Sequence, residues 1–533
     1  MAPSTKKTEP PEPVERQRSP RVSAALLERL AARAAVSVGK KTISVEAPFT
    51  GEVLGRVPHG TPADVAAACA TAREAQREWT RRSFAERAAV MLRFHDLVID
   101  NAAEILDIIQ LESGKARRHA FEEVLDVAIQ ARYYAHAAAA FLKPCRRQGA
   151  LPVLTKAWEH HHPRGVIGVI APWNYPLTLA VGDAVPALMA GNGVVVKPDA
   201  LTPFAALWAA GLLEEAGLPR GLLQVVTGRG AELGEPLVDG ADYLMFTGST
   251  ATGRKVAAMA AERLKDSSME LGGKNAMLVL PDASLRRAVP GAVRGITSNS
   301  GQLCISIERV YVHAAVHDLF AARLAESLRA VRLGPSLTFL EDMGSLIGAD
   351  QLAKVQGHVA DAVGKGAELL AGGKARPELG PYFFEPTLLT GVTDEMDLCR
   401  AETFGPVAAL FRCDSVQEMV DRANDSSYGL NASIWTRDTR FGRELATRVQ
   451  TGTVNINEAY SATWASASPM GGFKESGLGR RHGRQGIAKF TEAQTVAVER
   501  LLAIDTPPFL SHQQYATLMG AAMKLLRHAP LIK

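Results

Sequence analysis

Residues 166 to 197 read VIGVIAPWNYPLTLAVGDAVPALMAGNGVVVK. Val166 to Ile170 and Gly193 to Val196 are short runs rich in β-branched residues, and residues 177 to 190 between them have the apolar spacing of a helix. A strand, a helix and a second strand in this order form a βαβ unit with parallel strands. Similar runs follow, with strands expected at Leu222 to Val226, Tyr243 to Phe246 and Ala276 to Leu280, and helices at about 203 to 216 and 250 to 263. We therefore predict an α/β fold in which a parallel sheet has helices on both faces.

The flanks of this region have other patterns. Residues 65 to 142 are rich in alanine with helical apolar spacing, which predicts a helical layer on the N-terminal side. A second α/β block is expected over residues 281 to 457, where short β-branched runs again alternate with helical stretches. Residues 146 to 162 and 487 to 502 lie outside both blocks and alternate apolar and polar side chains. Such strands often pack as a small separate sheet or cross to a neighbouring subunit.

The composition is that of an ordinary globular protein. With 533 residues, of which 47% are apolar, the chain is long enough for two or more domains. Lys and Arg number 60 against 56 acidic residues, a net charge of +4 that is too balanced to indicate a nucleic-acid partner. The five cysteines lack paired spacing, which argues against disulfides and a bound metal and favours a reducing, cytoplasmic location. They are Cys69, Cys145, Cys304, Cys399 and Cys413.

Neither end of the chain carries a recognisable targeting or membrane signal. Residues 1 to 21 are rich in Pro, Glu, Lys and Arg and lack an apolar core, which predicts a disordered arm. No run approaches the roughly 18 apolar residues that a membrane span needs, so no membrane partner is expected. Residues 512 to 528 are mildly amphipathic, and we favour a helix packed on this chain or a neighbouring subunit over membrane contact.

Three residues offer the groups that a covalent mechanism needs. Cys304 ends the motif Gly-Gln-Leu-Cys, Glu270 begins Glu-Leu-Gly-Gly-Lys, and Asn174 lies in Pro-Trp-Asn-Tyr-Pro. They can supply a nucleophile, a base and an oxyanion donor. A free thiol with a pKa of about 8.5 is only slightly ionised at neutral pH, so Cys304 needs a lowered pKa or a base. Each residue also has a plainer interpretation: a buried apolar cysteine, a turn carboxylate and a turn amide.

A candidate nucleotide site follows one of the predicted strands. Gly248 and Gly253 lie five residues apart in Phe-Thr-Gly-Ser-Thr-Ala-Thr-Gly and open a helix, whereas the common dinucleotide signature is G-x-G-x-x-G. Gly248 allows the backbone to approach a pyrophosphate, and the helix presents free N–H groups. Lys197 ends another strand, where ligands of parallel sheets bind. A glycine turn that only joins a strand to a helix is the alternative.

Seven motifs in one order resemble those of the aldehyde dehydrogenase superfamily, from about residue 45 to residue 500. Within it, the run after Cys304, the segment 479 to 483 and the C-terminal extension look most like bacterial succinate-semialdehyde dehydrogenases of the actinobacterial type. The motifs are Pro-Trp-Asn-Tyr-Pro (172–176), Lys-Pro (197–198), Phe-Thr-Gly-Ser (246–249), Glu-Leu-Gly-Gly-Lys (270–274), Gly-Gln-Leu-Cys (301–304), Glu-Thr-Phe-Gly-Pro (402–406) and Gly-Leu-Gly-Arg (477–480).

The resemblance implies an oxidation in two halves. Cys304 would attack the aldehyde, and the Asn174 amide with the Cys304 backbone N–H would stabilise the oxyanion of the thiohemiacetal. Hydride would leave for a nicotinamide, and Glu270 would activate water to hydrolyse the thioester. Relatives that pass the acyl group to coenzyme A usually lack this carboxylate, so Glu270 favours release of a free acid.

The resemblance also implies a nicotinamide dinucleotide site, with NADP preferred and NAD possible. NAD-preferring relatives commonly carry Glu where this chain has Ala200, and a carboxylate there would repel a 2′-phosphate. Arg229 could add positive charge or be a solvated loop residue, and Glu402 could bind ribose or be an ordinary loop acid. The implied cofactor residues are Trp173, Asn174, Lys197, Pro198, Asp199, Ala200, Gly228, Gly248, Ser249, Leu271, Glu402 and Phe404.

The substrate implied by the resemblance is succinate semialdehyde, with another aliphatic or aromatic aldehyde as the alternative. Well-known relatives hold its carboxylate with two arginines, but here those positions are Gly182 and Ser298. Tyr175 and Trp464 are expected to line an apolar mouth. Many relatives also place Glu where this chain has Arg481, which implies that Glu270 works with water alone and that thioester hydrolysis is slow.

The expected fold is thus an aldehyde dehydrogenase-like one, with two parallel-sheet α/β domains and a small antiparallel oligomerisation sheet. A homodimer or homotetramer is expected. A different kind of function is also considered: a non-catalytic protein that has kept the fold. Such a protein would be expected to lack Cys304 or Glu270, and both are present. The expected segments are a disordered arm (1–22), a cofactor domain (23–145 and 163–280), a catalytic domain (281–478), oligomerisation segments (146–162 and 479–502) and a C-terminal extension (503–533).

Overall fold

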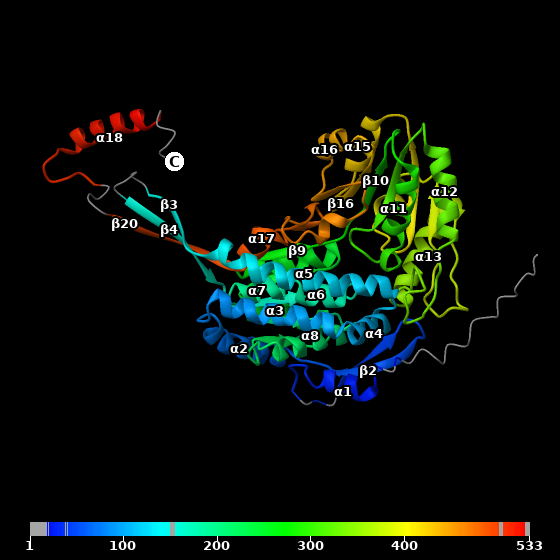
Figure 1. Ribbon diagram of the computed structural model, residues 1–533, viewed down its shortest axis with the longest axis horizontal. Coiled ribbons are helices and arrows are strands. Elements are labelled where there is room, and N and C mark those ends of the chain that lie inside the picture. The colour runs from blue at the N-terminus through cyan, green and yellow to red at the C-terminus, as the bar shows by residue number, and fades with distance from the viewer. Residues whose placement is uncertain are drawn as a thin grey trace, which may run out of the picture.

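Two large sheets and a smaller one organise the chain (Figure 1). The computed structural model describes residues 19, 21–37, 39, 41–149, 155–499 and 505–527. Most of the predicted N-terminal arm lies outside these residues. At its end, however, Ser19 is buried and donates a hydrogen bond from Oγ to Asp107 Oδ2 at 2.5 Å. Ser19 is thus bound to a buried acceptor on α4, while the expectation of a disordered arm over residues 1 to 22 stays a prediction.

The first sheet has the order β19-β9-β8-β5-β6-β7, and its strands β5 to β9 are parallel while β19 is antiparallel to β9. Alternate residues of β5 enter two different cores: Val166 and Ile170 face one, and Ile167 and Val169 face the other. Helices therefore cover both faces, as predicted. The strands are β5 (Val166–Ile170), β6 (Gly193–Lys197), β7 (Leu223–Val225), β8 (Tyr243–Thr247), β9 (Ser267–Glu270) and β19 (Gly477–Leu478).

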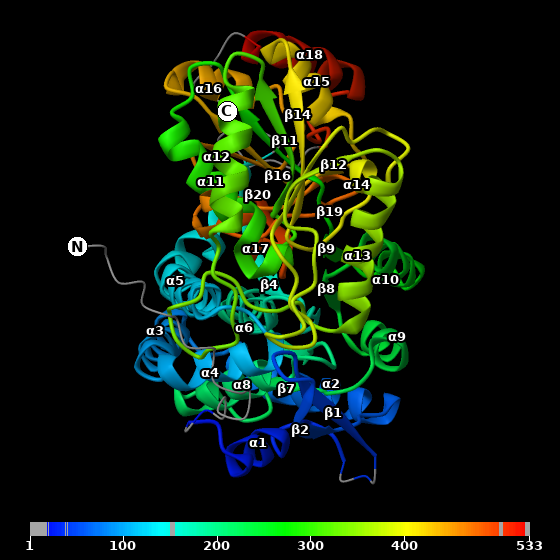
Figure 2. The same cartoon turned by 90° about the vertical axis from the view of Figure 1, so that its right-hand side faces the viewer.

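The two helical layers on this sheet come from different parts of the chain. The helices α2 (Pro62–Trp79), α9 (Gly230–Gly240) and α10 (Thr250–Glu262) cover one face. The other face carries α3 (Phe84–Asp100), α4 (Ala102–Ser113), α5 (Arg117–Leu142), α6 (Pro176–Val181), α7 (Ala184–Met189) and α8 (Phe204–Glu215), with α1 (Ala24–Ala31) beyond. A hairpin of β1 (Thr42–Ala47) and β2 (Glu52–Pro58) lies at the outer end (Figure 2). Capping boxes at Thr61 and Ser83 fix the starts of α2 and α3.

The second sheet has the order β12-β13-β14-β11-β10-β16-β17 and is parallel except for β12. Within it, β10 pairs with β11 and β16. The strand expected at Ala276 to Leu280 therefore belongs to this sheet and does not continue the first one. The spacing of apolar residues can identify a strand but does not show which strands it pairs with. For this reason the sequence assigned this strand to the wrong sheet. The strands are β10 (Asn275–Val279), β11 (Ile307–His313), β12 (Glu368–Ala371), β13 (Thr387–Thr390), β14 (Val407–Cys413), β16 (Asn431–Trp435) and β17 (Thr453–Ile456).

Shorter elements complete the second block. The strand pair β15 (Tyr428–Gly429) and β18 (Phe473–Lys474) links its edge to the chain that returns to β19. The remaining helices are α11 (Leu285–Thr297), η2 (Ser298–Gly301), α12 (His317–Arg329), α13 (Ala349–Gly364), α14 (Asp397–Arg400), α15 (Val416–Asn424), α16 (Thr439–Ala446), η3 (Ser461–Trp464) and α17 (Gly483–Ala488).

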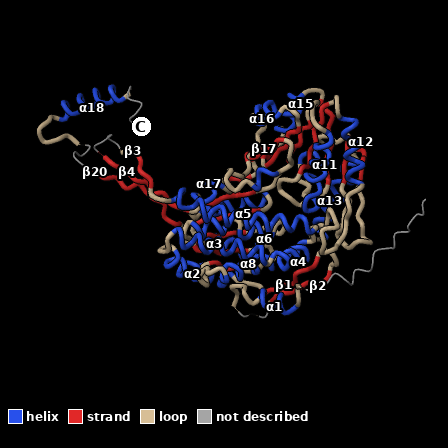
Figure 3. The backbone as a smooth tube through the Cα atoms, in the orientation of Figure 1, coloured by secondary structure: helices blue, strands red, loops and turns tan. Residues whose placement is uncertain are grey.

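The third sheet, β20-β4-β3, projects from the body as an antiparallel arm (Figure 3). It consists of β3 (Cys145–Gln148), β4 (Thr155–Pro163) and β20 (Thr491–Glu499), so the two alternating segments form the small sheet that was predicted. Beyond it, α18 (His512–Leu526) buries none of its described side chains. No described helix is long and apolar enough to cross a membrane.

Candidate active site

Two cavities meet between the first and second sheets. One, of about 240 Å³, opens at the ends of β8 and β9, and the other, of about 90 Å³, lies under α5, α6 and the segment after β17. Cys304 and Asn174 line both cavities, and Glu270 lines the larger one. The three residues predicted to carry chemistry, which are up to 130 positions apart in sequence, are thus brought to one junction.

The loop that carries Cys304 has an unusual backbone. Asn299 and Ser300 have φ of 50° and 55°, and Gly301 has φ of 71°. A Cβ on Gly301 would lie 2.0 Å from the Gly405 carbonyl oxygen, so this close crossing requires glycine. The Asn299 amide donates to the backbone oxygens of Asn174 (2.9 Å) and Gln302 (3.0 Å). These contacts fix the loop on either side of the site.

The thiol of Cys304 is held in its neutral form. Burial raises its pKa to about 12, and the nearby carboxylates of Glu270 and Glu402 add to the increase. Burial therefore disfavours the thiolate of Cys304 in the free protein. A neighbouring base has to take its proton.

Glu270 ends β9 and has the properties of such a base. Its side chain is 5% exposed, and neither carboxylate oxygen has a hydrogen-bond partner among the described residues. Burial raises its pKa to about 7, although Arg481 and Lys489 lower it in part. A carboxyl group with this pKa exchanges protons readily near neutral pH, which suits general-base catalysis.

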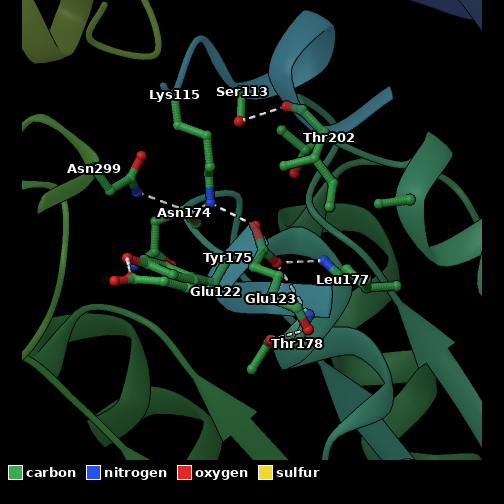
Figure 4. A network of polar contacts seen from close by, with 12 residues as sticks. Ser113, Lys115, Glu122, Glu123, Asn174, Tyr175, Leu177, Thr178, Thr202 and Asn299 are labelled. Atoms are coloured by element: carbon green, nitrogen blue, oxygen red, sulfur yellow. Dashed lines mark hydrogen bonds and ion pairs between the residues drawn. The ribbon is translucent and has the colours of Figure 1, made fainter. Parts of the chain in front are cut away.

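Asn174 lies between β5 and α6 with its amide at the junction of the cavities. Its Nδ2 donates to the Gln302 backbone oxygen at 3.0 Å, which leaves the second amide hydrogen for a ligand. Its own backbone oxygen accepts from Lys115 Nζ at 2.6 Å (Figure 4). The amide is therefore held in place from both sides before any substrate arrives.

Lys115 and Glu123 form a buried ion pair that was missed in the sequence (Figure 4). Glu123 also accepts from the backbone N–H groups of Leu177 at 2.9 Å and Thr178 at 3.1 Å, which lie in the first turn of α6. The pair thus connects α5 to the loop that carries Asn174. One sequence signal could have drawn attention to Lys115: it directly follows Gly114, the left-handed glycine that ends α4.

The larger cavity contains most of the residues predicted to bind a cofactor. Glu402 Oε1 accepts from the Gly273 N–H at 2.9 Å, and the rings of Trp173 and Phe404 meet edge to face with centroids 5.4 Å apart. A Cβ on Gly272 would lie 2.7 Å from Glu402 Oε2, so the absence of a side chain there makes room for the carboxylate. The predicted residues that line it are Trp173, Asn174, Gly248, Ser249, Leu271, Glu402 and Phe404.

The polar groups of this cavity suit a phosphate-bearing cofactor. Ser249 caps the N-terminus of α10, so the N–H groups of that helix begin at the cavity wall. Gln351 and Lys354 of α13 also line it and were missed, because helical spacing does not show which face meets a distant sheet. Gln351 Nε2 donates to the backbone oxygen of Phe404 at 2.6 Å, and Lys354 adds a positive charge.

The other predicted cofactor residues lie outside this lining, at the ends of neighbouring strands. Lys197 ends β6, and its Nζ lies 3.5 Å from the position of a Cβ on Gly230, at the start of α9. Burial lowers the pKa of Lys197. Asp199 Oδ1 accepts from the Leu201 N–H at 3.0 Å and closes the turn after the strand. Pro198 and Ala200 belong to the same turn, and Gly228 follows β7.

The smaller cavity is lined largely by aromatic and apolar side chains. Tyr175 and Trp464 both line it, as predicted. Ser298, one of the two positions where an arginine was expected, instead bonds the Tyr460 hydroxyl at 2.5 Å. Gly182, the other position, follows the last turn of α6. This cavity adjoins Cys304 and is the candidate aldehyde site.

Comparisons with known proteins agree with this geometry. The profile described as "Aldehyde dehydrogenase family" matches residues 35–496. The chain is 50% identical over 514 residues to a Mycolicibacterium smegmatis protein named "Putative succinate-semialdehyde dehydrogenase [NADP(+)]", covering 96% of this chain and 99% of that one. A Mycobacterium tuberculosis protein with the same name and the suffix 2 is 49% identical, covering 92% of this chain and 95% of that one.

Solved structures show the same fold. An aldehyde dehydrogenase from Bacillus cereus, described in complex with NAD⁺, matches with a TM-score of 0.82 and 35% identity over 86% of this chain and 93% of that one. A succinate-semialdehyde dehydrogenase from Burkholderia pseudomallei matches with a TM-score of 0.83 and 37% identity over 86% and 95%. The predicted resemblance is confirmed: the chain belongs to the aldehyde dehydrogenase family.

Proposed function

We propose that this protein oxidises succinate semialdehyde to succinate with NADP as the preferred cofactor. The observation that carries the proposal is the junction of the two cavities, where Cys304, Glu270 and Asn174 meet between a cleft lined by predicted cofactor residues and a smaller, mainly apolar one. The names of relatives about 50% identical over nearly the whole chain support the substrate and the cofactor. Oxidation of another aliphatic or aromatic aldehyde is the second candidate, favoured by the aromatic lining of the smaller cavity.

The reaction follows from the roles proposed for the three residues. Glu270 takes the thiol proton, and Cys304 Sγ forms a bond to the carbonyl carbon of the aldehyde. The resulting oxyanion accepts hydrogen bonds from Asn174 Nδ2 and the Cys304 backbone N–H. The bound cofactor supplies the hydride acceptor, and loss of hydride leaves a thioester on Cys304. Glu270 releases the first proton to solvent and then deprotonates water, whose oxygen adds to the thioester carbon. The C–S bond breaks, the leaving thiolate takes the proton back from Glu270, and a carboxylic acid and the free thiol result.

Comparing aldehydes directly tests the substrate. Succinate semialdehyde and butanal have the same four-carbon chain and differ in the terminal carboxylate. We expect kcat/KM, followed by the absorbance of reduced nicotinamide, to be about 10-fold or more higher for succinate semialdehyde, since one charged hydrogen bond contributes about 1.5–3 kcal/mol. Equal or better turnover of butanal or benzaldehyde would instead favour the second candidate.

Cofactor choice is tested at Ala200. Changing Ala200→Glu places a carboxylate in the turn after β6, where it should repel a 2′-phosphate. We expect KM for NADP to rise by about 10- to 100-fold while KM for NAD changes little or falls. Leu201→Glu, one residue further along an exposed part of the same turn, is the matched control and should leave both values unchanged. An unchanged KM for NADP in the Ala200 variant would refute this placement of the phosphate.

Assembly and location remain part of the proposal. We expect a homodimer or homotetramer built through the third sheet, because β20 is an edge strand whose side chains after Thr491 are exposed in the single chain.

The division into cofactor and catalytic domains also remains a prediction. A reducing, cytoplasmic location is likewise proposed from the sequence.

A further inference from the structure

Arg481 lies in the wall of the smaller cavity without a role in the mechanism above. Its backbone pairs with Met470, with hydrogen bonds of 2.7 and 2.9 Å that fix the segment between β19 and α17. The side chain is 5% exposed, and the cavity it lines also contains Cys304. A permanently charged group is therefore buried beside the aldehyde site.

The guanidinium is only partly satisfied within the described residues. Its Nη2 lies 3.0 Å from Asp183 Oδ2, yet neither Nε nor Nη2 makes a hydrogen bond. Asp183 is shared, since its Oδ1 accepts from Lys489 Nζ at 3.0 Å. A guanidinium carries five N–H donors, more than one shared carboxylate can satisfy, so Arg481 has donors left over for an acceptor in the cavity that it lines.

Arg481 is the one cation among the side chains that line this cavity. Burial lowers the pKa of the neighbouring His482 to about 3, so that imidazole is neutral. Two carboxyl groups, Glu122 and Asp126, share the lining, and burial raises the pKa of both, that of Asp126 to about 6. Asp126 also accepts from Gln130 Nε2 at 2.8 Å. A raised pKa keeps a larger fraction of each carboxyl group protonated and neutral. Glu122 and Asp126 therefore repel a bound carboxylate less than two exposed, ionised carboxylates would.

Gly182 makes the position of the guanidinium possible. A Cβ on this residue would lie 3.0 Å from Arg481 Nη2 and 3.2 Å from Gln130 Nε2. Its φ is −60°, an ordinary helical value, so the glycine provides space and no special conformation. Any larger side chain at 182 would occupy the volume that Arg481 now fills. A positive charge is thus present next to position 182, supplied by a residue about 300 positions later in the sequence.

We propose that Arg481 binds the carboxylate of the aldehyde substrate and selects aldehydes that carry an acid group at the far end of the chain. This inference rests on the proposed function and names the residue that gives it its specificity. The planar guanidinium presents paired N–H groups, and pairing them with a carboxylate adds direction as well as charge. The carbonyl at the other end of the substrate would then lie toward Cys304, in the same cavity.

The test compares two substrates across three variants. Arg481→Gln keeps a polar side chain but removes the charge, and should lower kcat/KM for succinate semialdehyde by about 10- to 100-fold, mainly through KM. Butanal, which has no carboxylate, should lose much less activity, and the part that it loses reflects the higher pKa of Glu270 once Arg481 is removed. Arg481→Lys should recover part of the loss, because it restores the positive charge but not the paired N–H groups of the guanidinium. Lys489 is the other cation that pairs with Asp183, but it does not line the cavity. Lys489→Gln should therefore leave the substrate preference unchanged.

The outcomes separate this inference from the proposed function. If the wild-type protein prefers succinate semialdehyde but Arg481→Gln slows both substrates equally, the function stands and Arg481 only positions neighbours such as Glu270. The same conclusion follows if Lys489→Gln changes the preference as much. If the wild-type protein does not prefer succinate semialdehyde, the proposed substrate itself is wrong. Should Arg481→Gln fail to fold, Arg481→Lys carries the same comparison, and an unchanged KM in a folded Lys variant argues against a paired contact.

Discussion

Replacing Cys304 by alanine is expected to abolish aldehyde oxidation, with kcat falling by about 10⁴-fold or more because no other group can form the acyl bond. The same loss is expected for Cys304→Ser, since a serine hydroxyl is far less acidic than a thiol and Glu270 cannot ionise it efficiently. The measurement is the rate at which reduced nicotinamide forms from succinate semialdehyde. Binding of NADP, followed by protein fluorescence, should change little because the cofactor cleft is otherwise intact.

A second cysteine provides the control for this experiment. Cys413 is also buried, and burial raises the pKa of its thiol to about 11, but it lies on β14 within the second core. Cys413→Ala should lower stability by about 1 kcal/mol or slightly more through lost packing while kcat stays within about twofold of wild type. Undiminished turnover in either Cys304 variant would remove the mechanism. Absence of turnover in the wild-type protein, by contrast, would favour the alternative of a family member that has kept the fold without the chemistry.

The strand boundaries that the sequence predicted best are those with all-apolar runs between breakers. Val166 to Ile170 matches β5 because the run lies between Gly165 and a proline-containing turn. By contrast, β9 was missed, although it carries Glu270 at its end. Its residues Ser267 to Glu270 are short and half polar, and they become a strand only because β8 and β19 offer backbone partners on both sides. Tertiary pairing, not local preference, makes this strand.

The site residues were predicted more fully than their surroundings. Motifs identified Cys304, Glu270 and Asn174, but not the buried pair of Lys115 and Glu123 that holds the Asn174 loop. A charged residue in a helical stretch of sequence is ordinarily solvated, and nothing in the spacing shows that both partners are buried. The state of Cys304 also needed coordinates. Its raised pKa depends on burial and on Glu270 and Glu402, which approach from two different strands or loops.

Glu270→Gln is expected to slow both halves of the reaction. The amide has the same shape but cannot accept a proton from the Cys304 thiol or from water, so steady-state turnover should fall by about 10²- to 10⁴-fold. Rapid mixing should show a much slower burst of reduced nicotinamide, because the same base acts before hydride transfer. The wild-type protein should show a fast burst, since Arg481 stands where many relatives carry a glutamate that relays protons to the base. A missing burst in the wild-type protein would contradict slow hydrolysis.

The pH dependence of the same pair of proteins identifies the base. Glu270 acts only when ionised, and burial raises its pKa from the ordinary carboxyl range to about 7. Wild-type turnover should therefore rise through about pH 7 and level off above it, whereas an ordinary carboxylate would already be fully active at pH 6. In Glu270→Gln this rise should disappear, leaving a low rate that increases only as hydroxide becomes available. A variant that retains the step near pH 7 would assign it to another group, and Glu402, whose pKa is also raised to about 7, would be the next residue to replace.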